Sequence, residues 1–87
     1  MSVRHNEAAS RYELDTPNGL AIAVYREQAG SRVFTHTEVP PADEGHGFGA
    51  QLVKAALDDT RAHGFKIVPA CSYVVAYVRR HPEYAGS

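Results

Sequence analysis

Three glycines alternate with larger residues in the segment Glu44–Gly49, directly before an apolar stretch that is predicted to be a helix. The first N–H groups of a helix have no partners within the helix, and the helix dipole is positive there. Such a junction favours an anion such as a phosphate. Side chains at Gly45, Gly47 or Gly49 would keep a ligand away from these amides. A flexible connection to the helix is the alternative interpretation of the same glycines.

The glycine segment differs from two common nucleotide-binding loops. It lacks the Gly-Lys-Ser/Thr sequence of a Walker loop, and its Gly-x-Gly-x-Gly spacing is not that of the dinucleotide fingerprint. The segment therefore disfavours nucleoside triphosphate chemistry and leaves phosphate binding open.

The pattern of apolar residues predicts an α/β (α+β) fold with the element order β-β-β-α-β-α. Strands are expected where apolar and polar residues alternate, and helices where apolar residues form one stripe. Turn residues at 16–19 and 27–31 predict that the first three strands are antiparallel. The first ten residues show no period, so a loosely ordered lead-in is expected. The predicted strands are 11–15, 20–25, 32–39 and 65–69, and one helix follows the glycine segment up to His63. A second helix is predicted over 72–81, where β-branched and aromatic residues also suit a strand.

Alternation along the predicted strand 32–39 assigns its side chains to two faces of the sheet. One face is predicted to carry Val33, Thr35, Thr37 and Val39, and the other Phe34, His36 and Glu38.

Composition limits the class of protein. A chain of 87 residues encloses one core, so a single domain over residues 1–87 is expected. A net charge of -1 gives no long-range attraction to nucleic acid. The longest apolar run, Tyr73–Val78, is far shorter than the roughly 20 residues that span a bilayer. With one cysteine and no histidine pair at helical ligand spacing, a cytoplasmic protein without disulfide, metal or membrane contact is expected.

Residues 39–49 resemble the pyrophosphate loop of the GNAT superfamily of acetyl-CoA-dependent N-acetyltransferases, written Gln/Arg-x-x-Gly-x-Gly/Ala. Gly47 and Gly49 match its glycines, whereas Glu44 stands where Gln or Arg is usual. Residues 34–41, 69–73 and 80–84 further resemble the small, minimal GNAT-like proteins of the NATD type. The resemblance extends from about residue 6 to residue 84.

The resemblance implies a half-sized acetyltransferase fold, with a mixed, mostly antiparallel sheet and two helices. Acetyl-CoA would lie in a cleft where two neighbouring parallel strands separate, and the acceptor site would be open. The pyrophosphate would meet amides of the glycine segment, and the pantetheine arm would pair with one strand. The implied cofactor-binding residues are Thr37, Val39, Gly45, His46, Gly47, Phe48, Gly49 and Ala50.

Acetyl transfer to an amine needs a base for the nucleophile and an acid for the departing thiolate. His36 is the candidate base, with Glu38 to orient it; a strand histidine packed beside Phe34 is the alternative. Cys71 follows the last predicted strand and has three open roles: covalent acetyl carrier activated by His36, proton donor to the thiolate, or buried thiol. Tyr77 lies near the tyrosine acid of larger GNAT members, but its spacing favours a core position.

The sequence therefore predicts an enzyme, an N-acetyltransferase that moves an acetyl group from acetyl-CoA to an amine of a small molecule or a protein lysine. A non-catalytic CoA- or acyl-CoA-binding module is the alternative. The acceptor and the oligomeric state are left open by the sequence.

Overall fold

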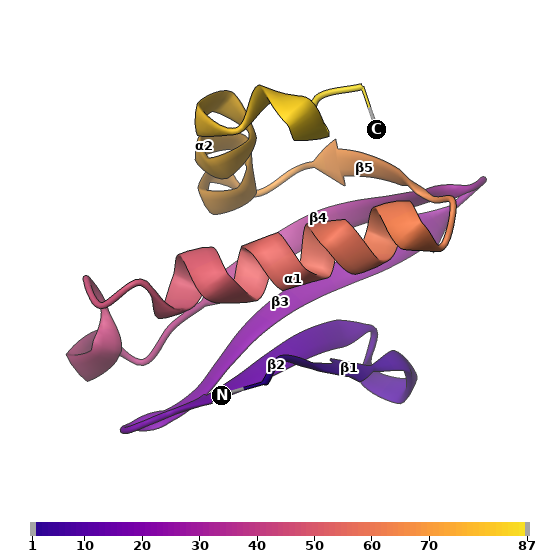
Figure 1. The fold of residues 1–87 in the computed structure, drawn as a ribbon. Coiled ribbons are helices and arrows are strands. Elements are labelled where there is room, and N and C mark those ends of the chain that lie inside the picture. Colours follow the sequence, from indigo (N-terminus) through magenta and orange to yellow (C-terminus); the bar gives the residue numbers. More distant parts are fainter. Residues whose placement is uncertain (1, 87) are drawn as a thin grey trace.

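The structure, a computed structural model, describes residues 2–86. It contains one five-stranded mixed sheet and two α-helices (Figure 1). The strands lie in chain order, the first four antiparallel and the last pair parallel. The α+β fold and its element order are confirmed, apart from one added strand. The elements are β1 (Arg4–Asn6), β2 (Arg11–Thr16), β3 (Gly19–Gln28), β4 (Ser31–Glu38), α1 (Phe48–Ala62), β5 (Lys66–Pro69) and α2 (Ser72–Arg80).

The hairpin between β3 and β4 is fixed by its two turn residues. Ala29 and Gly30 have φ angles of 46° and 84°, and Gln28 pairs with Ser31. Two successive positive φ angles define the turn whose twist matches that of the flanking strands. The predicted turn at 27–31 is confirmed, and it sets the register of the strand that leads to the glycine segment.

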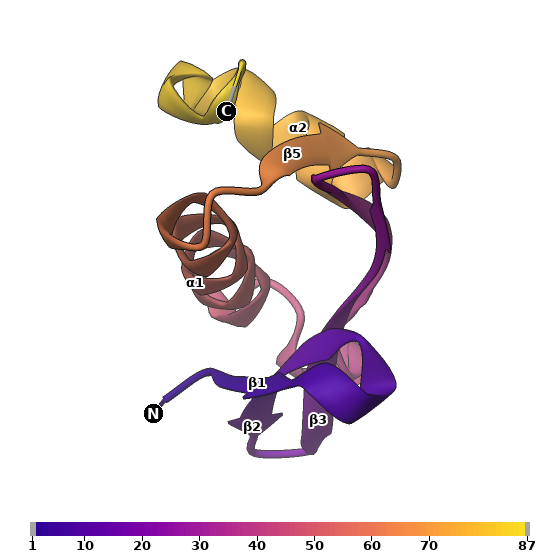
Figure 2. The same ribbon diagram turned by 90° about the vertical axis from the view of Figure 1, so that its right-hand side faces the viewer.

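The core lies between one face of the sheet and α1, which crosses that face (Figure 2). On β3 the inward positions are Ala21, Ala23 and Tyr25, all nearly inaccessible to solvent. The larger Leu20 and Ile22 point to the opposite face and are half-buried. Small inward side chains allow the helix to lie close to the centre of the sheet.

The N-terminal segment is better ordered than the sequence indicated. Arg4–Asn6 pair antiparallel with β2, so the prediction of a loose lead-in is wrong for these residues. A strand of three residues is too short to show a period, and its side chains hold it in place. The Nε2 atom of His5 lies 2.6 Å from the Tyr25 hydroxyl, and the Asn6 amide donates to Glu13 at 3.0 Å.

A β-bulge at Thr35 reverses the facing of the second half of β4. Tyr25 pairs with Phe34 and Val24 with His36, so Thr35 is an extra residue in β4. A bulge of one residue shifts the alternation by one position. Phe34 is buried, and Thr37 then faces the same side of the sheet. The prediction that Phe34 shares a face with His36 and Glu38 is therefore wrong, because the bulge separates them.

A buried guanidinium joins three strands to α1. Arg32 is only 3% exposed, and its Nη1 donates to the Tyr12 hydroxyl at 2.6 Å. That hydroxyl donates to an Asp59 carboxylate oxygen, also at 2.6 Å. The guanidinium lies over the rings of Tyr25 and Phe65, 4.9 and 4.5 Å from their centroids. The network links β2, β3 and β4 to the last turns of the helix.

Neither helix among residues 2–86 has the length and apolar character needed to cross a membrane.

Candidate functional site

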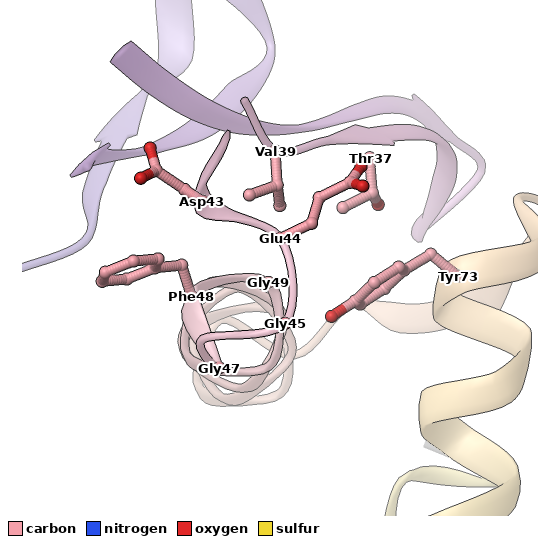
Figure 3. A pocket seen from close by; sticks show the side chains of 9 residues that line it. All are labelled: Thr37, Val39, Asp43, Glu44, Gly45, Gly47, Phe48, Gly49 and Tyr73. Carbon is pink, nitrogen blue, oxygen red and sulfur yellow. The ribbon is translucent and has the colours of Figure 1, made fainter. Parts of the chain in front are cut away.

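A pocket of about 410 Å³ opens at the N-terminal end of α1. The end of β4, the glycine segment, the first turn of α1 and one side chain of α2 line it (Figure 3). Its lining residues are Thr37, Val39, Asp43, Glu44, Gly45, Gly47, Phe48, Gly49 and Tyr73. Six of the eight residues predicted to bind the cofactor lie in this lining, and His46 and Ala50 adjoin it in the chain. Their roles in binding stay predictions.

Gly45 and Gly47 are required by the path of the backbone. Their φ angles are 83° and 82°, in the left-handed region that disfavours side chains. A Cβ on either would meet no atom of the described chain within 4 Å, so space is not the constraint. Gly47 is the N-cap of α1, and its carbonyl accepts the first helical bond from Gln51 N–H at 3.0 Å.

The start of α1 presents peptide N–H groups to the pocket. Phe48, Gly49 and Ala50 form its first turn and precede the first helical donor, so their N–H groups have no partner within the helix. None of these three side chains carries a negative charge. The positive end of the helix dipole therefore faces the pocket without an acid in the first turn.

Gly49 has a different role from the other two glycines. It is buried, and a Cβ there would overlap the hydroxyl of Tyr73. The sequence explanation, in which Gly49 leaves space for a ligand, is replaced by close packing of the Tyr73 phenol against the helix. Tyr73 was not among the predicted site residues. No sequence pattern marks this residue, which lies in the first turn of α2 with its side chain 38% exposed.

Asp43 anchors the glycine segment to the turn between β2 and β3. The buried carboxylate accepts the Asn18 backbone N–H at 2.9 Å and the Asn18 side-chain amide at 2.7 Å. Burial alone would raise the pKa of Asp43, but hydrogen bonds from Thr16 and Asn18 outweigh it and hold the pKa below its usual value. The ionised carboxylate thus fixes the segment, a role that sequence reasoning missed.

The two parallel strands separate beside the pocket. β5 pairs with Ser31–Phe34, whereas β4 continues to Glu38. The Phe34 carbonyl accepts both the Ala70 and the Cys71 N–H at 3.0 Å, which turns the chain away from β4. Beyond this point the edge of β4 runs toward the pocket without β5 alongside it. The predicted separation of the two parallel strands is present.

The predicted catalytic residues fall into two separate groups. The Cys71 sulfur lies 3.4 Å from the Thr37 hydroxyl, on the pocket side of β4. His36 adjoins Thr37 in the strand and points to the opposite face, where its Nε2 lies 3.8 Å from Glu38. The structure thus brings Thr37 to Cys71 and Glu38 to His36, and it does not bring His36 to Cys71.

Tyr77 is a core residue, as the sequence favoured. It is 4% exposed and stacks on the His81 ring at a centroid distance of 4.2 Å. Burial raises the pKa of its phenol. The tyrosine that reaches the pocket is Tyr73, one helical turn earlier.

No group of three or more His, Cys, Asp or Glu side chains gathers closely enough among residues 2–86 to hold a metal ion.

The fold is that of a GCN5-like acetyltransferase. Its parallel strands separate beside the N-terminus of a helix that follows a glycine-rich turn. The family model described as GCN5-related N-acetyl-transferase matches residues 11–86, and the chain belongs to this family of N-acetyltransferases. The chain is also similar to a solution NMR structure of a GCN5-like proposed N-acetyltransferase from Staphylococcus aureus. The two share 26% sequence identity with a TM-score of 0.71, over 95% of this chain and 82% of that one.

Proposed function

We propose that this protein, acting as one minimal domain of the NATD type, uses acetyl-CoA to acetylate an amine of a small molecule or a protein lysine. The amine nitrogen attacks the thioester carbonyl carbon, the carbon–sulfur bond breaks, and the products are an N-acetyl amine and the CoA thiol. One observation carries the proposal. The N-terminus of α1 and the free end of β4 open into the same pocket.

The pocket suits two chemically different parts of acetyl-CoA. The diphosphate is assigned to the N–H groups of Phe48, Gly49 and Ala50, which lie at the positive end of the helix. The peptide-like pantetheine arm is assigned to the main chain of Thr37 and Val39, where β4 runs beyond β5. The remaining glycine-segment residues, Gly45, His46 and Gly47, would enclose the diphosphate.

The side chains near the strand separation supply proton transfer. Acetyl-CoA brings the activated acetyl group, so the protein must accept a proton from the amine and return one to the thiolate. Cys71 and Tyr73 are the proposed donors on the pocket side. His36, paired with Glu38 on the other face, is the proposed base for an amine that approaches from there. Cys71 lies beside Thr37, on the face of β4 opposite to His36, so His36 is not placed to activate the thiol. This arrangement favours direct transfer over an acetyl-Cys71 intermediate.

The first test is a calorimetric titration with acetyl-CoA, combined with amide spectra of the labelled protein. Saturable binding is expected, with the largest shifts at residues 45–50 and 37–39. Binding that leaves these resonances unmoved would place the ligand elsewhere and refute the assignment. Incubation with amine acceptors then measures thiol release, which a non-catalytic CoA-binding module would not give.

Replacing the proposed proton-transfer residues is expected to slow turnover without loss of acetyl-CoA affinity. For His36→Ala and Cys71→Ala we expect turnover to fall roughly 100-fold to 10,000-fold, the range of general acid–base contributions. His63→Ala is the matched control, because both histidine side chains are 59% exposed and His63 lies at the far end of α1. Mass spectrometry without an acetyl adduct on Cys71 supports direct transfer. Unchanged rates in both variants would remove them from the mechanism.

A further inference from the structure

One carboxylate of the pocket is at odds with the anion proposed to bind there. Glu44 follows the short 3-10 helix Pro41–Asp43, and its extended backbone leads into the glycine segment. Its side chain points along the pocket toward Thr37 (Figure 3). Among residues 2–86, no side chain donates a hydrogen bond or forms an ion pair with this carboxylate.

The other acid of the lining does not raise the same difficulty. The Asp43 carboxylate is buried and engaged by two hydrogen bonds from Asn18, so its lone pairs are directed away from a ligand. The Glu44 side chain is exposed and lines the pocket. Like charges that share a pocket repel each other, and dissolved salt screens this repulsion.

We infer that Glu44 is a specificity-determining residue for the acyl donor. Resting on the proposed function, the inference is that its carboxylate opposes the diphosphate and weakens binding of nucleotide-bearing donors. A donor that has the same pantetheine arm and no phosphate escapes this repulsion. Glu44 therefore reduces the affinity advantage of acetyl-CoA over acetyl thioesters that carry only the pantetheine arm. The same repulsion favours release of the CoA product.

The test compares two donors on three proteins. Dissociation constants are measured for acetyl-CoA and for phosphate-free acetylpantetheine, with the wild type, Glu44→Gln and Glu7→Gln. Glu7 is an exposed acid in the connection between β1 and β2, outside the pocket lining, and serves as the matched control. Glutamine keeps the size and polarity of Glu44 and removes only its charge.

For Glu44→Gln we expect acetyl-CoA to bind roughly tenfold more tightly at low salt, with less than about a twofold change for acetylpantetheine. The gain should shrink when salt is raised from about 20 mM to about 500 mM, because screening weakens the repulsion. Glu7→Gln should match the wild type with both donors.

Three outcomes would overturn the inference: unchanged acetyl-CoA affinity in Glu44→Gln, an equal gain for both donors, or weaker acetyl-CoA binding. The last would mean that the carboxylate helps to hold the ligand. Failure of the proposed function is distinct, since the wild type would then show no saturable binding of acetyl-CoA at all.

Discussion

Replacing Gly47 by valine is expected to weaken acetyl-CoA binding at least about tenfold while the sheet and both helices remain folded. Gly47 has a φ angle of 82° and caps α1. A β-branched residue is strongly disfavoured in this left-handed conformation, so the valine backbone will relax to a different angle. The N–H groups of the first helical turn would then no longer be oriented toward the pocket. Calorimetry with acetyl-CoA measures the loss.

Gly64→Val is the matched control for this substitution. Gly64 has a φ angle of 77°, and a Cβ there would meet no described atom within 4 Å, as at Gly47. It follows the opposite end of α1, so the two variants share the same local strain and differ only in position. Both should lose about 1–3 kcal/mol of stability, whereas only Gly47→Val should lose affinity. Equal loss of affinity in both would show that general destabilisation, and not the pocket, is responsible.

Replacing Arg32 by alanine is expected to lower the free energy of unfolding by about 2–4 kcal/mol, since it empties a buried site and removes a hydrogen bond to the buried Tyr12 hydroxyl. The guanidinium is 3% exposed and donates to Tyr12, which in turn bonds to Asp59. Its loss leaves these polar groups incompletely paired and opens a cavity beneath two aromatic rings. Small domains have total stabilities of about 5–15 kcal/mol, so the variant should be close to unfolding at ordinary temperature.

Urea denaturation measures this effect, with Arg26→Ala as the control. Arg26 is an exposed arginine of β3, and its loss should change stability by less than about 0.5 kcal/mol. Arg32→Met, which restores the volume without the charge, should recover part of the loss. If Arg32→Ala and Arg26→Ala are equally stable, the buried network contributes nothing to the fold.

Local patterns in the sequence predicted most of the fold. Alternation and turn residues found β2, β3, β4 and β5, and the apolar stripe found α1. β1 was missed because three residues show no period, and its anchors are long-range contacts such as that of His5 with Tyr25. The bulge at Thr35 was missed because residues 33–37 contain no glycine or proline that would mark it.

The candidate site was predictable from the sequence only where the backbone conformation restricts the residue type. Gly45 and Gly47 are visible in the sequence because positive φ angles select glycine. Tyr73 and Asp43 are not visible, because their roles depend on contacts with Gly49 and Asn18, far away in the chain. The separation of His36 from Cys71 likewise depends on the bulge at Thr35, whose position cannot be predicted from the residue types around it.

That extra residue makes the strand pairing of β4, and not only its composition, a determinant of chemistry. If Thr35 paired with Val24 in a regular ladder, every later side chain of β4 would face the other side of the sheet, so the His36 imidazole and the Glu38 carboxylate would enter the pocket and the Thr37 hydroxyl would leave it. Deleting Thr35 would remove the bulge and keep the present faces, so the place where the strand accommodates its extra residue decides which side chains meet the donor.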